Sequence, residues 1–105
     1  MNKSFFQDIQ QKSHEVMPKG TRVVLFGSQA RGDADSESDW DILILMDKSQ
    51  IGDNDYDNYA YPLVEMGWRK NQQVSPMIYT FQDWQRRKPT SLYHNIETEG
   101  IEICH

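Results

Sequence analysis

The sequence predicts a small α/β (α+β) domain with a mixed sheet of three or more strands flanked by helices. Three short apolar runs, at residues 21–26, 40–46 and 74–79, have the length and the β-branched or aromatic content of buried strands. Segments with apolar residues at helical spacing lie before, between and after these runs. A chain of 105 residues supports one modest core, so we expect residues 1–105 to form a single domain.

The first half of the chain predicts a helix and two strands. Residues 2–17 carry apolar side chains at helical spacing until Pro18-Lys19-Gly20 end the helix. Thr21–Phe26 follows as a short buried strand between two glycines. Trp40–Met46 is apolar on both faces, as expected of a strand in a sheet that is covered on both sides.

The second half adds a third strand and further helices. After an acidic loop at residues 51–57, a helical face continues, and Pro62 should kink or restart that helix. The strand at 74–79 contains Pro76, which suggests a sheet edge or a bulge. Two short helices and a tail complete the chain: residues 81–87, 91–99 and 101–105. Three aromatic residues are expected in or beside the core: Trp68, Trp84 and Tyr93.

Composition excludes some classes of protein. The formal net charge is −5, which opposes non-specific binding to nucleic acid. No apolar stretch approaches the roughly 20 residues of a membrane span, and the N-terminus lacks the apolar segment of a signal peptide. The single cysteine, Cys104, allows no internal disulfide. We therefore expect a cytoplasmic protein.

Residues 25–45, LFGSQARGDADSESDWDILIL, interrupt two of the apolar runs with a polar segment. Gly27 and Ser28 directly follow a strand, where glycine lets the backbone turn and a ligand approach its amides. If a helical turn begins there, its free N–H groups favour a phosphate, to which Ser28 and Arg31 could add contacts. Taken alone, however, a Gly-Ser pair fits an ordinary strand-to-turn junction better.

Asp39 and Asp41 change this interpretation. Residues two apart on a strand point to the same face, so these two carboxylates should converge. Paired carboxylates repel each other unless a cation lies between them, and partly open oxygen ligands suit Mg²⁺. A solvated strand start would explain an Asp-x-Asp alone. It does not explain a phosphate cradle on the neighbouring strand as well.

The segment GSQARGDADSESDWDILIL resembles the signature of the nucleotidyltransferase superfamily related to DNA polymerase β. Its Ala-Arg-Gly and Ser-Asp-x-Asp make it similar to the minimal nucleotidyltransferases, short proteins often encoded beside a helical partner of the HEPN type. The matching residues are Gly27, Ser28, Ala30, Arg31, Gly32, Ser38, Asp39 and Asp41.

The resemblance implies a site for a nucleoside triphosphate and Mg²⁺. The residues implied in nucleotide binding are Gly27, Ser28, Arg31 and Ser38. Asp39 and Asp41 would hold Mg²⁺ and act in catalysis. Active members commonly carry a third carboxylate on the neighbouring strand, where this chain has Ser75 at or close to the expected place. Two nearby acids would replace it only if the fold brings them in: Glu65 and Asp83.

These features support two main hypotheses about function. The first is a Mg²⁺-dependent nucleotidyltransferase that moves a nucleoside monophosphate to a hydroxyl of a protein or a small molecule. The second is a catalytically weakened, antitoxin-like subunit that binds a helical HEPN-type partner. A plain phosphate-binding domain would account for Gly27 and Ser28 but leaves the aspartate pair unexplained.

Overall fold

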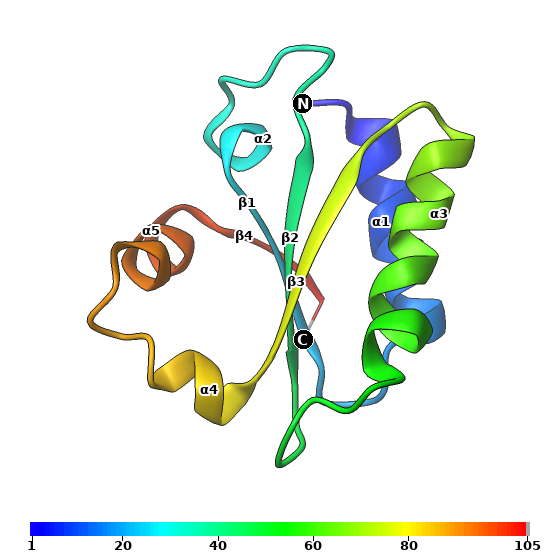
Figure 1. Cartoon of the computed structure of the whole chain (residues 1–105). Helices are drawn as coiled ribbons and strands as arrows, with labels where there is room; N and C mark the ends of the chain where they lie inside the picture. Colours follow the sequence, from blue (N-terminus) through cyan, green and yellow to red (C-terminus); the bar gives the residue numbers. More distant parts are fainter. Residues whose placement is uncertain (105) are drawn as a thin grey trace.

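The computed structural model describes residues 1–104 and confirms the predicted fold class (Figure 1). The four strands are β1 (Arg22–Phe26), β2 (Trp40–Met46), β3 (Val74–Thr80) and β4 (Ile101–Cys104). The helices are α1 (Lys3–Val16), α2 (Ser28–Arg31), α3 (Tyr61–Arg69), α4 (Phe81–Gln85) and α5 (Ser91–Glu99), and a π-helical turn, η1 (Tyr56–Ala60), precedes α3. The strand order is β3-β2-β1-β4, with β2 and β3 parallel and the other pairs antiparallel.

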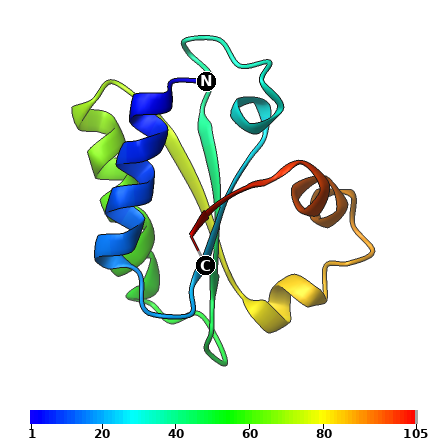
Figure 2. The same ribbon diagram turned by 180° about the vertical axis from the view of Figure 1, so that it is seen from behind.

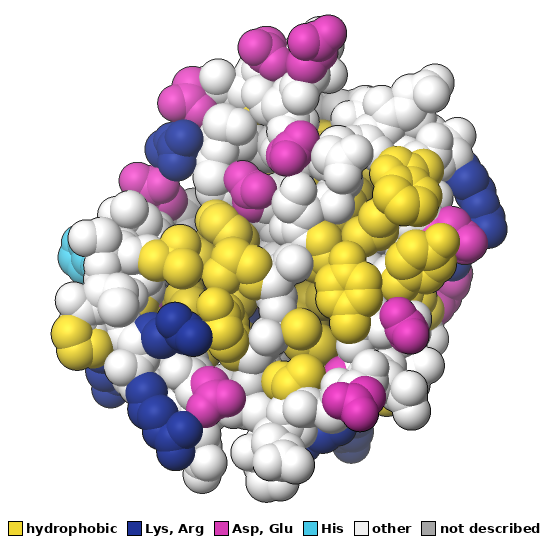
Figure 3. Space-filling model, viewed as in Figure 1, with side chains coloured by type: hydrophobic (Ala, Val, Ile, Leu, Met, Phe, Trp, Pro, Cys, Tyr) yellow, Lys and Arg dark blue, Asp and Glu magenta, His cyan; other side chains and the backbone are white. Residues whose placement is uncertain are grey.

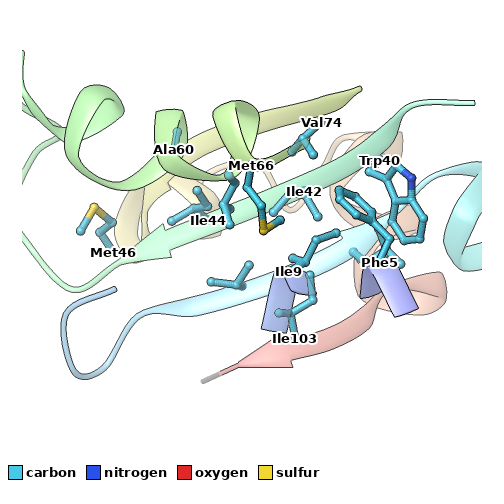
Figure 4. Packing of buried hydrophobic residues seen from close by; sticks show 13 residues of the cluster. Phe5, Ile9, Trp40, Ile42, Ile44, Met46, Ala60, Met66, Val74 and Ile103 are labelled. Atoms are coloured by element: carbon cyan, nitrogen blue, oxygen red, sulfur yellow. The ribbon is translucent and has the colours of Figure 1, made fainter. Parts of the chain in front are cut away.

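Different helices cover the two faces of the sheet. Helices α1 and α3 lie on one face, and α4 and α5 lie on the other (Figures 1 and 2). Alternate side chains of β2 enter the two layers: Trp40, Ile42, Ile44 and Met46 on the α1–α3 side, and Leu43 and Leu45 on the α4–α5 side. Figure 4 shows the first of these layers, which also contains Phe5 and Ile9 of α1. By the same alternation, Asp39 and Asp41 face the α4–α5 side.

Local sequence features explain where the first helices begin. The side chain of Asn2 caps α1 by accepting a hydrogen bond from the Phe5 amide at 3.0 Å. Phe5 then packs edge-to-face on Trp40, with ring centroids 5.0 Å apart. Pro62 lies in the first turn of α3, directly after η1, so the helix restarts there as predicted.

Within residues 1–104, no helix is both long enough and apolar enough to cross a membrane.

The prediction that Pro76 marks a sheet edge is confirmed, because β3 is an edge strand. The Trp40 amide donates to the Gln73 carbonyl at 2.8 Å. In a parallel ladder with this register, the amides of β3 that face β2 belong to residues 75, 77 and 79. Position 76 therefore faces the open edge, where proline's missing N–H removes no ladder bond.

Two predictions were wrong. Residues 101–104 form β4 on β1 and are not a tail, while His105 lies outside the described residues. Four residues carry too short a pattern to indicate a strand, and it is pairing with β1 that stabilises β4. Trp68 is 55% exposed and lies against Tyr61, so it is not part of the core, whereas Trp84 is fully buried. In the view of Figure 1, the surface of the molecule carries two hydrophobic areas, and acidic side chains gather above them (Figure 3).

Candidate functional site

The turn between β1 and α2 is built around Gly27. This residue has φ +77° and ψ −156°, a conformation that side-chain-bearing residues rarely adopt, and α2 begins at the next residue. A Cβ at position 27 would overlap a carboxylate oxygen of Asp41 and would lie only 3.2 Å from the Cγ atom of Asp41. The turn therefore lies directly against Asp41, and both its conformation and its space require glycine.

The predicted carboxylate pair lies at the start of β2, between two other strands. Asp41 pairs with Phe26 at the end of β1 and with Ser75 near the start of β3. The Ser75 hydroxyl donates a hydrogen bond to Asp39 Oδ2 at 3.1 Å. The structure thus brings Asp39, Asp41 and Ser75 together beside the Gly27 turn.

Electrostatics in this pair favour a bound cation. Burial raises the pKa of Asp41, and the neighbouring charge of Asp39 raises it further, while Arg31 opposes the shift. Both causes disfavour the ionised form of Asp41, and the charge of Arg31 offsets them only in part. A cation between the two carboxylates would remove this repulsion.

The donor set at the pair fits a magnesium ion. Carboxylate oxygens are hard ligands, and Mg²⁺ commonly binds one or two of them while it keeps waters and substrate phosphate oxygens. Residues 1–104 contain no group of three or more His, Cys, Asp or Glu side chains that could hold a metal. The described chain therefore offers two acidic ligands, and further ligands would come from substrate and water.

The carboxylate pair adjoins a cleft of about 340 Å³ between α2 and α5. Four predicted site residues line it: Gly27, Ser28, Arg31 and Asp41. The opposite wall comes from α5 and consists of Leu92, Asn95, Ile96 and Glu99. These four residues follow the i, i+3, i+4, i+7 spacing of one helical stripe. Sequence reasoning missed this wall, because α5 carries no motif and its stripe does not tell which surface it faces.

Arg31 links the two walls of the cleft. Its guanidinium lies 3.4 Å from the Asp33 carboxylate and 3.5 Å from that of Glu99 on α5. Because the Arg31 side chain is 45% exposed, these pairs contribute little stability and can exchange for another anion. Arg31 therefore offers, at one end of the cleft, a positive charge whose present acidic partners a bound anion can replace.

Ser38 is placed differently from the other predicted nucleotide-binding residues. Its hydroxyl accepts a hydrogen bond from the Asp35 amide at 3.0 Å and lies 3.2 Å from the Asp35 carboxylate. These contacts close the turn that leads into β2. Ser38 is not among the residues that line the cleft, so its structural contribution is to the turn before Asp39.

Within residues 1–104, neither Glu65 nor Asp83 takes the place of the expected third carboxylate. Glu65 lies on α3, which covers the other face of the sheet, and pairs with Arg69 at 2.8 Å. Asp83 lies beyond the far end of β3 and pairs with Arg86 at 2.8 Å. Ser75, directly opposite Asp41, is the β3 residue that contacts the aspartate pair.

Comparison with known proteins supports the motif and the fold. The sequence profile of the nucleotidyltransferase domain family matches residues 3–100. A protein of Methanocaldococcus jannaschii, named provisionally as a protein adenylyltransferase, is 34% identical over 101 residues, covering 96% of this chain and 93% of the relative.

Two crystal structures have a similar fold. One is described as a toxin–antitoxin with AMP-PNP. It has a TM-score of 0.66 at 20% identity, and the match covers 99% of this chain and 73% of the neighbour's chain. The other, a double mutant of the toxin–antitoxin MntA–HpeT, has a TM-score of 0.65 at 18% identity, over 94% of this chain and 72% of its own. At these identities the likeness concerns the fold alone.

Proposed function

The chain belongs to the nucleotidyltransferase domain family and is a transferase enzyme, and we propose that it moves AMP from ATP to a hydroxyl group of a partner protein in a Mg²⁺-dependent reaction. The observation that carries this proposal is the contact between the Gly27 turn and Asp41. It joins a turn suited to phosphates and a carboxylate pair suited to Mg²⁺ at one cleft. The name of the archaeal relative supports adenylyl transfer to protein.

Each residue of the site has a role in this reaction. Asp39 and Asp41 would hold Mg²⁺, which when bound offsets charge on the phosphates and on the departing pyrophosphate. The Ser28 hydroxyl and the backbone beside Gly27 would contact phosphate oxygens, and Arg31 would add positive charge. The acceptor oxygen would attack the α-phosphorus, the bond from this phosphorus to the oxygen that bridges it to the β-phosphorus would break, pyrophosphate would leave, and the proton of the acceptor hydroxyl would pass to solvent.

We propose a helical HEPN-type protein as the acceptor and partner. Both fold neighbours are toxin–antitoxin proteins, and one was described with AMP-PNP, a nucleotide analogue. The double mutant of the second replaces two aspartates, spaced two residues apart, by glutamate. Asp39 and Asp41 have the same spacing, which is consistent with a shared use of the pair.

A second candidate function is partner binding without efficient transfer. Ser75 in place of a carboxylate favours it, because a hydroxyl is a weaker metal ligand and a weaker base than an ionised acid. In that case the chain would still bind ATP with Mg²⁺, held by Asp39 and Asp41, and would act as an antitoxin-like subunit.

The test is a titration with α-labelled ATP, with and without Mg²⁺, on the wild type and on Asp39→Asn. Asp47→Asn is a matched control, because Asp47 is exposed and directly follows the other end of β2. Mg²⁺-dependent binding that is lost only in Asp39→Asn supports the site, and transfer of label to a co-purified partner supports the enzyme. Binding without transfer favours the second candidate. No binding at millimolar ATP refutes the transferase and leaves a fold that serves partner recognition alone.

A further inference from the structure

The cleft between α2 and α5 has two chemically different ends. At one end, Arg31 contacts Glu99 in the last turn of α5. Leu92, on the same helical stripe, is seven residues earlier and therefore about 10 Å away along the helix axis, at about 1.5 Å per residue. The cleft thus runs from a charged end to an apolar end.

The apolar end has an exposed side chain that core packing does not explain. Leu92 is 38% exposed, although most leucines of this chain are fully buried. It lines the cleft together with Phe26 and the buried Ile96. An apolar wall that remains open to solvent suits the flat face of an aromatic ring, as in most small-molecule sites.

Asn95 adds a polar group to this wall. Asn95 is exposed where it lines the cleft, so its donor and its acceptor are both available to a ligand. On its N7 edge, adenine carries the 6-amino donor beside the N7 acceptor, and an asparagine carboxamide complements this pair with two hydrogen bonds. The same edge of guanine presents two acceptors, O6 and N7, which one carboxamide cannot pair with.

We propose that α5 provides the base subsite of the nucleotide site, with Leu92 against the face of adenine and Asn95 paired to its 6-amino group and N7. This assignment rests on the nucleotide binding proposed above and deepens it. The triphosphate lies toward Gly27, Ser28 and Arg31, and the base lies toward Leu92. Neither α5 residue belongs to the motif at residues 27–41.

Isothermal titration calorimetry tests the subsite with three probes in the presence of Mg²⁺: ATP, GTP and inorganic tripolyphosphate. For the wild type we expect ATP to bind about five-fold or more tightly than GTP, the discrimination of one bidentate pair. In Asn95→Ala this preference disappears while tripolyphosphate affinity is unchanged. Leu92→Ser weakens both nucleotides and leaves tripolyphosphate unchanged. His94→Ala, an exposed neighbour on α5 that does not line the cleft, is the matched control.

The outcomes separate this inference from the proposed function. Equal affinity of the wild type for ATP and GTP, or an Asn95→Ala variant that keeps its preference, overturns the subsite and leaves nucleotide binding intact. An equal loss of all three probes in Asn95→Ala also overturns it, since the residue would then act on the phosphates. If neither nucleotide binds the wild type, the proposed function itself is refuted.

Discussion

Two glycines with positive φ, five residues apart, allow the link between the Gly27 turn and Asp41 to be tested by the same substitution. Gly27 and Gly32 have φ values of +77° and +86°. A Cβ at Gly27 would overlap the Asp41 carboxylate, whereas a Cβ at Gly32 would meet no atom within 4 Å. Alanine at either position is strained, but alanine at position 27 must also displace Asp41.

The magnitudes follow from backbone conformation and from this overlap. Gly32 is in the left-handed helical region, where alanine costs about 1–2 kcal/mol. Gly27, with ψ −156°, is in a region used almost only by glycine, with a cost of about 1–3 kcal/mol before any clash. Asp41 is half-buried between β1 and β3, and its carboxylate must move to make room for a Cβ at position 27. Such a movement changes its position relative to Asp39, the other proposed metal ligand.

Urea denaturation and Mg²⁺-dependent ATP binding should therefore respond differently. We expect Gly32→Ala to lose about 1–2 kcal/mol of unfolding free energy and to keep its ATP affinity. Gly27→Ala should lose more stability and should also lose Mg²⁺-dependent binding under conditions where it remains folded. If folded Gly27→Ala binds Mg²⁺ and ATP like the wild type, the Gly27 turn and the carboxylate pair do not form one site.

Three further predictions address stability, the metal and the cleft. Glu97→Ala should lower the unfolding free energy by about 1–3 kcal/mol, because the buried indole N–H of Trp84 loses its acceptor at 2.7 Å. Hydrogen bonds from Arg22, and then from Trp84, hold the pKa of Glu97 below its ordinary 4.5. The stabilising contribution of Glu97 is therefore present above pH 4.5 and is lost as the pH falls through the lower folded-state pKa. The unfolding free energies of the wild type and of Glu97→Ala should accordingly converge in acid. Ser75→Asp should tighten Mn²⁺ binding, measured by electron paramagnetic resonance, because it adds a third carboxylate to the pair; an unchanged affinity would show that position 75 does not face the metal. Glu99→Gln should tighten ATP binding slightly, since the exposed carboxylate of Glu99 competes with phosphate for Arg31; weaker binding in calorimetry would contradict this role.

The parts of the site that are close in sequence could be predicted, and those assembled by the fold could not. Gly27, Asp39 and Asp41 lie within one short segment, and the strand period alone places both carboxylates on one face. The α5 wall lies more than 50 residues later, and its position depends on the chain passing through β3 and α4 first. No local pattern in Leu92 or Asn95 indicates that path.

The missed strand β4 and the exposed Trp68 have a related cause. A four-residue strand shows only two side chains per face, so its alternation cannot be told from chance, and its pairing with β1 lies nearly 80 residues away. On α3, the side of the helix that packs against the sheet carries Leu63, Val64 and Gly67, and Trp68 lies outside this buried face. In both cases the tertiary partner, and not the local sequence, decides the burial.

The acidic charge of the chain is consistent with an anionic substrate only if that substrate arrives with its metal. Free ATP would meet a protein of net charge −5 and a carboxylate pair beside the cleft, with Arg31 already paired to acids. Repulsion of this kind opposes binding. A Mg²⁺ ion that arrives with the nucleotide would place an attractive charge directly at the two carboxylates and so offset this repulsion where it is strongest. The same two aspartates would therefore both bind the metal and exclude nucleotide that lacks it, which accounts for acids at this position in a chain that is acidic elsewhere.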